Sequence, residues 1–304
     1  MKKCKYYFDW NNPSTGIFSS IEEVILSKKT KYQNIDVVNF SSYGLGLIID
    51  GKIQTSEYDD FLYHETIVHI PFLTHSAPRK IFIIGGGDGG VLREAIKYKK
   101  VTEITMVDID NEAVEICKKY LEKIHRGAFY DPRLKLVFDD GRKFVEETND
   151  KFDIAIIDST DPLEGGTSHL LFTKQFFKAL RDKLYNDGMV VVQSNCLLPR
   201  REEMTFFLSL RKTLESIFEK VSFASIYLPS FALQWIFQIA SRKYTPEDLT
   251  EEEIERRIKE RINGELKLID GKTFKSLTVM PKFLREMIKT HNEIISDDKP
   301  IFVF

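Results

Sequence analysis

The sequence is short of cysteine, of long apolar runs and of net charge, and each shortage excludes a class of protein. Its three cysteines, Cys4, Cys117 and Cys196, are far apart and show no CxxC spacing, so neither a disulfide framework nor a metal site built on cysteine is expected. No stretch has the apolar length of a signal peptide or a membrane span. The net charge of −2, from 44 basic and 46 acidic residues, is not that of a nucleic-acid-binding protein. We therefore expect a cytoplasmic protein with neither a membrane nor a nucleic-acid partner.

Two patterns divide the 304 residues into a small and a large domain. Short strand-like runs at 32–38, 46–49 and 52–55, with a hairpin turn at Asp50-Gly51, predict a β-rich domain followed by a linker helix over 63–73. We place this N-terminal domain at residues 1–75 and a catalytic domain with C-terminal helices at residues 76–304. A further helix is expected over 245–261, opened by Thr245 as its cap and Pro246 at its first position.

From residue 80 onward, apolar strands alternate with amphipathic helices. This rhythm predicts an α/β fold with a doubly wound, Rossmann-like sheet of mostly parallel strands. Only three residues separate the last two strands, which is too few for a crossover, so the last strand should be antiparallel as in methyltransferase-type sheets. The strands are expected at 80–84, 103–107, 134–138, 152–157, 188–193, 221–228 and 233–240.

An acidic residue, Asp88, lies inside the glycine-rich turn from Gly85 to Gly90 that follows the first of these strands. Glycines at such a turn let a ligand approach the backbone at a helix N-terminus. A pyrophosphate would meet the Asp88 carboxylate there, which disfavours a dinucleotide and hence an NAD-dependent dehydrogenase. The same residues are also compatible with a tight turn that has no ligand and in which Asp88 caps the helix.

Two more acids, Asp108 and Asp140, follow the next two strands. Asp108 comes twenty residues after Asp88, where a ribose hydroxyl would be held. Asp140, next to Gly141, could accept a hydrogen bond from the amine of adenine, or could simply cap the helix that follows. Because ligands bind at the carboxyl ends of the strands in doubly wound sheets, the three acids together predict a nucleoside that carries positive charge. An S-adenosyl sulfonium with an amine fits this description.

Asp158 and Asp161 follow the fourth strand, three residues apart. An alkylammonium has a pKa of about 10, so its nitrogen must lose a proton before it can act as a nucleophile. A carboxylate next to it can bind the cation and take up that proton, and the pair therefore predicts alkylation of an amine. In the alternative interpretation Asp161 only caps a turn before Pro162. His64 could lie over the same crevice or could be a buried histidine without chemistry; the other histidines show no metal-ligand spacing, and no metal is expected.

Five linked motifs resemble those of the polyamine aminopropyltransferases, the spermidine synthase family. They are DGKIQ…DDFLYHE (50–65), GGGDGGVLRE (85–94), VDID (107–110), DDG (139–141) and DSTDP (158–162). The resemblance implies transfer of an aminopropyl group from decarboxylated S-adenosylmethionine to a polyamine, with methylthioadenosine as by-product. The donor is then a co-substrate, and no cofactor is implied. A homodimer or homotetramer assembled through the β-rich domain is also implied.

The resemblance also implies roles for individual residues. Asp158 would be the base, assisted by Tyr63 and Asp161. The donor would contact Gln33, His64, Gly85, Asp88, Asp108, Asp140, Gly141 and Asp158. The acceptor would contact Gln54, Tyr63, Asp161, Glu164, Gln193, Tyr227 and Trp235, with His64 lining the same channel.

Departures from the family pattern concern the acceptor. The segments 163–169 and 228–235 resemble the thermospermine synthase branch. Asn195 stands where spermidine synthases often carry an acid that anchors a short diamine, and Glu164 is expected to offer a different anchor. We therefore expect spermidine as acceptor, giving thermospermine or spermine, with putrescine or agmatine as the alternative. More distant alternatives are an S-adenosylmethionine-dependent methyltransferase and a polyamine-binding relative without turnover.

Overall fold

The computed structural model of the protein describes residues 5–12, 15–166 and 168–303. Its N-terminal part is a five-stranded antiparallel sheet in sequence order: β1 (Lys5–Asn12), β2 (Thr15–Lys29), β3 (Asn34–Phe40), β4 (Gly44–Ile49) and β5 (Lys52–Ser56). The predicted hairpin at Asp50-Gly51 is confirmed, with both residues at positive φ as a two-residue hairpin turn requires. Strands β1 and β2 were not predicted from the sequence. Cys4 and Thr167 lie outside the described residues.

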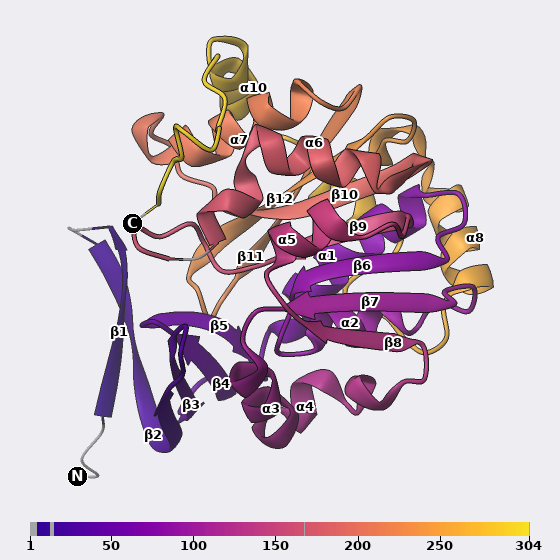
Figure 1. The fold of residues 1–304 in the computed structure, drawn as a ribbon. Helices are drawn as coiled ribbons and strands as arrows, with labels where there is room; N and C mark the ends of the chain where they lie inside the picture. Colours follow the sequence, from indigo (N-terminus) through magenta and orange to yellow (C-terminus); the bar gives the residue numbers. More distant parts are fainter. Residues whose placement is uncertain (1–4, 13–14, 167, 304) are drawn as a thin grey trace.

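The larger part is a seven-stranded sheet with the order β11-β12-β10-β9-β6-β7-β8 (Figure 1). All seven predicted strands are present, and β12 runs antiparallel to both β10 and β11, which confirms the methyltransferase-type topology. The strand bounds are β6 (Lys80–Gly85), β7 (Glu103–Asp108), β8 (Leu134–Phe138), β9 (Phe152–Asp158), β10 (Leu184–Cys196), β11 (Lys220–Leu228) and β12 (Leu233–Ser241). The carboxyl ends of β6 and β7 face the five-stranded sheet (Figure 1).

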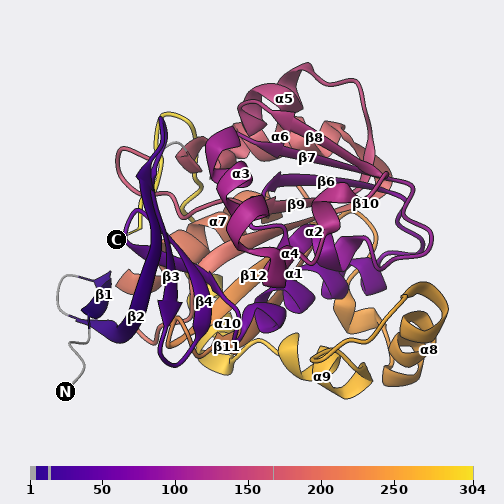
Figure 2. The ribbon, with the colours of Figure 1, turned by 90° about the horizontal axis from the view of Figure 1, so that it is seen from below.

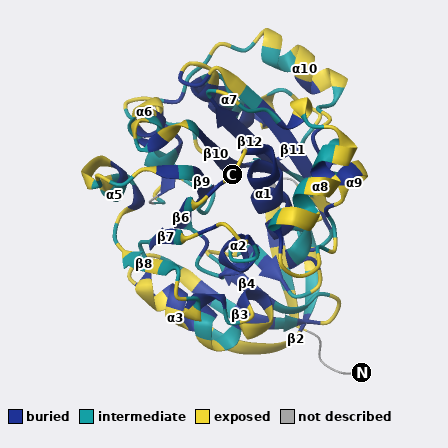
Figure 3. Ribbon diagram, turned by 90° about the vertical axis from the view of Figure 1, so that its right-hand side faces the viewer, coloured by how far each residue is buried: buried dark blue, intermediate teal, exposed yellow. Residues whose placement is uncertain are grey.

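Helices cover both faces of the large sheet because its strands are apolar on both sides. Along β6, Ile81 and Ile83 pack into the core beneath α1 and α2, while Phe82 and Ile84 pack on the opposite face with α5, α6 and α7. Figure 3 shows α1 buried over most of its length, and only residues 61–63 are partly exposed. The helices are α1 (Asp60–Thr74), α2 (Gly90–Ala95), α3 (Asn111–Tyr120), α4 (Glu122–His125), α5 (Gly141–Glu147), α6 (Lys174–Asp182), α7 (Thr205–Glu215), α8 (Glu251–Arg261), α9 (Gly271–Leu277) and α10 (Lys282–Lys289).

Two predicted boundaries need correction. The linker helix α1 packs in the core of the large sheet, so the division between the two parts lies near residue 59 rather than 75. The expected helix over 245–261 begins later, since Thr245 caps only a single 3-10 turn (Pro246–Asp248) and Thr250 caps α8. Figure 2 shows α8 and α9 on the far side of the molecule from the five-stranded sheet. No described helix combines the length and apolar character that crossing a membrane requires.

Candidate active site

A cavity of about 270 Å³ lies between the two sheets, at the carboxyl ends of the parallel strands. Seven aspartates line it, against only one lysine and one arginine among the described lining residues. Such an excess of carboxylates attracts cations. Most of the predicted site residues meet here: Gln33, Gln54, Tyr63, His64, Gly85, Asp88, Asp108, Asp140, Gly141, Asp158, Asp161, Gln193 and Trp235.

The glycine turn after β6 is built for close approach. Gly85, at φ +77°, leaves no room for a side chain, because an added Cβ would lie 2.2 Å from the Asp158 carbonyl oxygen. The amide of Gly86 donates to that same carbonyl at 2.9 Å, which joins the turn to the end of β9. At Gly90 an added Cβ would lie within 2.4 Å of the His64 ring. The glycines therefore let α1 and β9 bring their polar side chains against the turn.

The three acids that follow successive strands, Asp88, Asp108 and Asp140, all line the cavity. Asp88 accepts a hydrogen bond from the Gly90 amide at 2.8 Å, and Asp108 accepts one from the Asp110 amide at 2.9 Å. Burial raises the pKa of Asp108 to about 6. Asp140 caps α5 through the amides of the next turn and also lines the cavity, so its two proposed roles are compatible.

Asp158 is held at the end of β9 by Tyr63 of α1. The Tyr63 hydroxyl donates to Asp158 Oδ1 at 2.5 Å. Burial, reinforced by the charge of Asp88, raises the pKa of Asp158 to about 6. The Tyr63 ring is itself fixed by an edge-to-face contact with Phe237, at 5.1 Å between ring centroids. Asp158 is therefore a positioned carboxylate with a pKa suited to exchanging a proton near neutral pH.

Asp161 points its carboxylate into the same cavity and does not cap a turn with it. Oδ1 accepts a hydrogen bond from the Gln193 amide at 2.9 Å, and Oδ2 accepts one from the Asn195 amide at 3.0 Å. Burial raises the pKa of Asp161 to about 6. Asn195, at φ +65°, thus helps to orient the Asp161 carboxylate. An acid at position 195 would instead repel Asp161.

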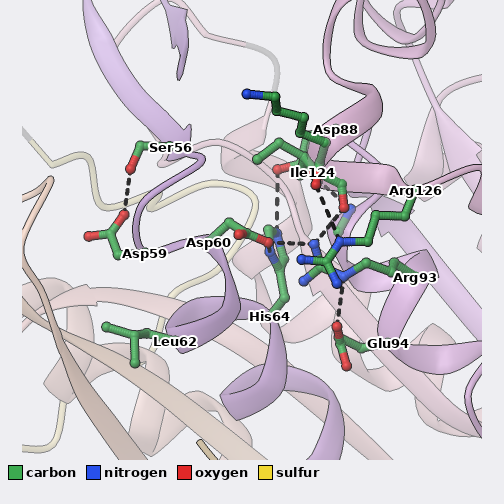
Figure 4. Close-up of polar contacts among 12 residues, drawn as sticks. Ser56, Asp59, Asp60, Leu62, His64, Asp88, Arg93, Glu94, Ile124 and Arg126 are labelled. Atoms are coloured by element: carbon green, nitrogen blue, oxygen red, sulfur yellow. Dashed lines mark hydrogen bonds and ion pairs between the residues drawn. The ribbon is translucent and has the colours of Figure 1, made fainter. Parts of the chain in front are cut away.

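His64 lies between two carboxylates, as Figure 4 shows. Its Nε2 is 3.4 Å from Asp88 Oδ2, and its Nδ1 is 3.5 Å from Asp60 Oδ2. Burial by itself lowers the pKa of His64, but the charge of Asp88 and the interaction with Asp60 raise it to about 10. His64 is therefore a buried cation that adjoins Asp88 in the cavity wall. From the sequence it could either lie over the crevice or be buried, and the structure shows that it does both.

Behind His64 lies a buried ion-pair network that the sequence analysis missed. Arg93 Nη1 donates to Asp60 Oδ2 at 2.5 Å, and Arg93 Nε donates to Glu94 Oε1 at 2.7 Å (Figure 4). Each of these three side chains is at most 5% exposed. The four-residue spacing of Asp60 and His64 on a helix was the available clue, since such residues share a face.

Two predicted acceptor residues do not reach the cavity. Glu164 is exposed on the loop after β9 and is absent from the cavity wall. Tyr227 is 51% exposed on the edge strand β11, where alternation turns it away from the core. In their place the structure brings Asp9 of β1 and Lys52 of β5 to the wall, together with Phe231, whose ring meets that of the predicted Trp235 edge to face at 5.2 Å between ring centroids.

A second polar cluster lies outside the cavity. Among the described residues, His75, Asp153 and Asp187 bring possible ligand atoms within 4.8 Å of one another. However, His75 Nδ1 accepts a hydrogen bond from the Ala77 amide at 3.2 Å, so the neutral ring carries its proton on Nε2. A proton on Nε2 leaves no lone pair there for a metal ion. Cys117 and Cys196 are both free and buried.

Comparisons with known proteins agree with this geometry. The profile of the spermine/spermidine synthase domain matches residues 60–251, and that of the spermidine synthase tetramerisation domain matches residues 6–57. The polyamine aminopropyltransferase of Sulfurisphaera tokodaii is 39% identical over 303 residues, covering 100% of this chain and 99% of that protein. The enzyme of the same name from Saccharolobus solfataricus is 38% identical and covers 98% of both chains.

Two solved structures share the fold over almost the whole chain. A spermidine synthase in complex with the transition state analogue AdoDATO has a TM-score of 0.86 and 29% identity, covering 96% of this chain and 97% of that one. The spermidine synthase from Thermotoga maritima has a TM-score of 0.85 and 30% identity, covering 95% and 96%. Match lengths, identities and the converging acids lead to one conclusion: the chain belongs to the spermine/spermidine synthase family, the polyamine aminopropyltransferases.

Proposed function

We propose that the protein transfers the aminopropyl group of decarboxylated S-adenosylmethionine to an amine of a polyamine, and releases methylthioadenosine. The observation that carries this proposal is the meeting of Asp158, Tyr63 and Asp161 beside Asp88 in one acidic cavity. The donor is a sulfonium with a free ammonium, and the acceptor is a polycation. Both suit a wall with seven aspartates.

The donor half of the cavity would be the glycine turn and the first three strand ends. Asp108 would accept hydrogen bonds from the ribose hydroxyls, and Asp140 one from the adenine amine. Asp88 would pair with the ammonium of the aminopropyl group. Intact S-adenosylmethionine would instead bring its carboxylate close to Asp88, and this repulsion is the reason to prefer aminopropyl over methyl transfer.

The transfer would need only a bound base. The acceptor nitrogen gives up a proton to Asp158 and attacks the aminopropyl carbon attached to sulfur. A new C–N bond forms while the C–S bond breaks, and sulfur keeps the electron pair, so that the sulfonium becomes a neutral thioether. Tyr63 would orient Asp158 through its 2.5 Å hydrogen bond, and Asp161 would hold the acceptor amine in line.

The acceptor that we favour is spermidine, giving a tetraamine. Glu164 does not line the cavity, so it no longer supports this choice. Asp9 supplies a carboxylate at the part of the wall formed by the N-terminal sheet, where it would suit the third ammonium of a triamine. Putrescine stays the alternative because Lys52 already pairs with Asp9, at 3.3 Å between Nζ and Oδ1.

The test is to incubate the protein with decarboxylated S-adenosylmethionine and, separately, putrescine, agmatine, cadaverine or spermidine. We expect equal amounts of methylthioadenosine and of one aminopropylated product, identified by chromatography and mass spectrometry. Intact S-adenosylmethionine with the same amines is the control and should give no product. Methylated amines in that control, or no transfer to any amine, would overturn the proposal.

The pH dependence of kcat/KM should show the titration of the base. Asp158 accepts a proton only when it is ionised, and burial raises its pKa to about 6. The ionised fraction, and with it kcat/KM, should be nearly constant above pH 7 and should fall by at least tenfold per pH unit below 6. The fall should be steeper than that of a single group, because burial also raises the pKa values of Asp108 and Asp161 to about 6 and both are assigned to substrate binding. Initial rates between pH 4.5 and 8 would measure the midpoint.

Tyr63→Phe provides the matched variant for this profile. The Tyr63 hydrogen bond favours the ionised carboxylate of Asp158 and so lowers its pKa against the effect of burial. Its removal should shift the acidic midpoint to higher pH. The control Tyr185→Phe, at an exposed residue, should leave the midpoint in place. A midpoint that is the same in all three proteins would contradict the assignment of Asp158 as the titrating base.

The N-terminal sheet is matched by a tetramerisation domain, which supports an oligomer. Its β1–β2 hairpin exposes an aromatic face, with Tyr6, Phe8, Trp10 and Phe18 each more than half exposed. Exposed aromatic clusters of this kind are typical of surfaces that associate. We infer that this hairpin contributes to the contact between copies in a homodimer or homotetramer.

A further inference from the structure

A lysine lies in a cavity otherwise suited to cations. Lys52 of β5 lines the cavity, and its Nζ is 3.3 Å from Asp9 Oδ1 and also donates to the Trp10 carbonyl oxygen. The other oxygen of Asp9 accepts a hydrogen bond from the Ile53 amide at 3.3 Å, which ties the carboxylate to β5. The Lys52 side chain is 29% exposed and that of Asp9 is 11% exposed, so both are partly shielded from water.

We place this ion pair in the acceptor half of the cavity, because Ile53, next to Lys52, packs in one apolar cluster with Phe231, whose ring contacts Trp235. Asp161 lines the same cavity, and the charges of both members of the pair act on its carboxylate. Burial raises the pKa of Asp161 most, the positive charge of Lys52 lowers it, and the negative charge of Asp9 raises it. The other basic side chain of the described cavity wall, Arg142, is held in a two-pronged ion pair with Asp297 at 2.6 and 2.7 Å. Apart from the buried His64, Lys52 is thus the cation of the described wall that pairs with an acid of that wall not assigned to the donor.

A diamine and a triamine make different demands on this pair. The two nitrogens of a diamine are served by Asp158 and Asp161. A triamine brings a third ammonium, and Asp9 and Asp50 are the aspartates of the described wall that remain. Asp50 Oδ1 already accepts two hydrogen bonds from Asn34, so we assign the third ammonium to Asp9. Lys52 already neutralises Asp9 and would repel that ammonium.

We propose that Lys52 occupies the place beside Asp9 where the third ammonium of a triamine would bind, and so sets how well the protein accepts a triamine relative to a diamine. This inference rests on the function proposed above. The residue acts on specificity and takes no part in the transfer step. Its effect is therefore a change in the ratio of two specificity constants, and the proposal holds whichever acceptor the natural protein prefers.

The experiment measures kcat/KM for spermidine and for putrescine with decarboxylated S-adenosylmethionine, by release of methylthioadenosine. Lys52→Met removes the charge but keeps an unbranched side chain. We expect it to raise the spermidine-to-putrescine ratio roughly tenfold, the effect of one charge-assisted contact that becomes free for the substrate. Lys52→Arg keeps the charge and should keep the ratio of the natural protein. Lys28→Met, on the exposed β2 strand, controls for loss of a lysine elsewhere in the same sheet.

A second variant separates specificity from a merely structural role. Asp9→Asn still offers an oxygen to the Ile53 amide but has no charge. If Asp9 receives the third ammonium, the gain of Lys52→Met should disappear in the double variant Asp9→Asn/Lys52→Met. Circular dichroism and thermal unfolding of each variant would establish that the fold is kept.

The outcomes separate this inference from the proposed function. A natural protein that transfers to no amine defeats the proposed function itself. If the natural protein is active but Lys52→Met leaves the spermidine-to-putrescine ratio of kcat/KM unchanged or lowers it, only the role of Lys52 is overturned. A gain that persists without the charge of Asp9 likewise overturns it, since the third ammonium would then bind elsewhere.

Discussion

Asp158→Asn is expected to lower kcat by about 10³-fold, within the range that general-base catalysis contributes. Asparagine keeps the shape of the side chain, and its oxygen still accepts the hydrogen bond from the Tyr63 hydroxyl. It has no basic oxygen to take the proton from the attacking amine, and the nitrogen lone pair stays blocked. The measurement is a single-turnover rate with saturating donor and acceptor.

Donor binding is the internal control for this variant. Of the four acids assigned to the donor, Asp88, Asp108 and Asp140 are unchanged, and the asparagine in Asp158→Asn keeps the shape of the fourth. The affinity for methylthioadenosine, measured by calorimetry, should therefore stay within a few-fold of the natural value. Asp182→Asn, at a side chain that is 61% exposed, controls for the same chemical change outside the cavity. Turnover that survives Asp158→Asn would remove the base from the mechanism, and Asp161 would then need to be tested in its place.

Arg93→Met is expected to lower the free energy of unfolding by about 3 kcal/mol or more. Arg93 is 5% exposed and pairs with both Asp60 and Glu94. Its removal takes one cation from each of two buried carboxylates and leaves only His64 beside Asp60, and His69 and Lys97 beside Glu94. Burial alone raises the pKa of Asp60, but His64 and Arg93 together hold it below its ordinary value. The measurement is urea unfolding at pH 7, monitored by fluorescence and circular dichroism.

Arg256→Met is the matched comparison. Arg256 also pairs with two acids, Glu253 and Glu260, but its side chain is 53% exposed on α8. Water replaces such a partner at little cost, and we expect a change below about 1 kcal/mol. Equal losses in the two variants would mean that burial of the Arg93 network contributes nothing of its own. Arg93 also holds Asp60 in place, and Asp60 in turn pairs with His64, which adjoins the proposed donor residue Asp88. The Arg93 variant should therefore bind the donor more weakly than the natural protein.

Much of the site could be predicted from the sequence because its chemistry follows a regular rule of the fold. Parallel strands end at one edge of the sheet, so an acid placed after each strand is automatically near the others. Asp88, Asp108, Asp140 and Asp158 follow four strands whose apolar runs are unmistakable, and all four line the cavity. The glycine-rich turn could also be predicted from the sequence, because a Cβ at Gly85 or Gly90 would collide with its neighbours and only glycine fits there.

Other parts depended on which distant segments meet, and local pattern does not encode this. Glu164 was expected to face the acceptor, but it is exposed, although Leu163 and Gly166 of the same loop line the cavity. Asp9 and Lys52 enter the wall because the five-stranded sheet lies across the strand ends, an arrangement formed by contacts between residues far apart in the chain. Arg93 likewise acquires its role only when α2 packs on α1.

The amino-acid order alone therefore established the layered sheet, the row of acids at its edge and the kind of substrate that such acids attract. These depend on periodicity and on neighbours a few residues apart. The folded chain decided how His64 is charged, what holds Asp161 in place and which cation stands in the path of the acceptor. These depend on burial and on pairing across the cavity, because a charge is weak in water and strong only where another part of the chain excludes the solvent.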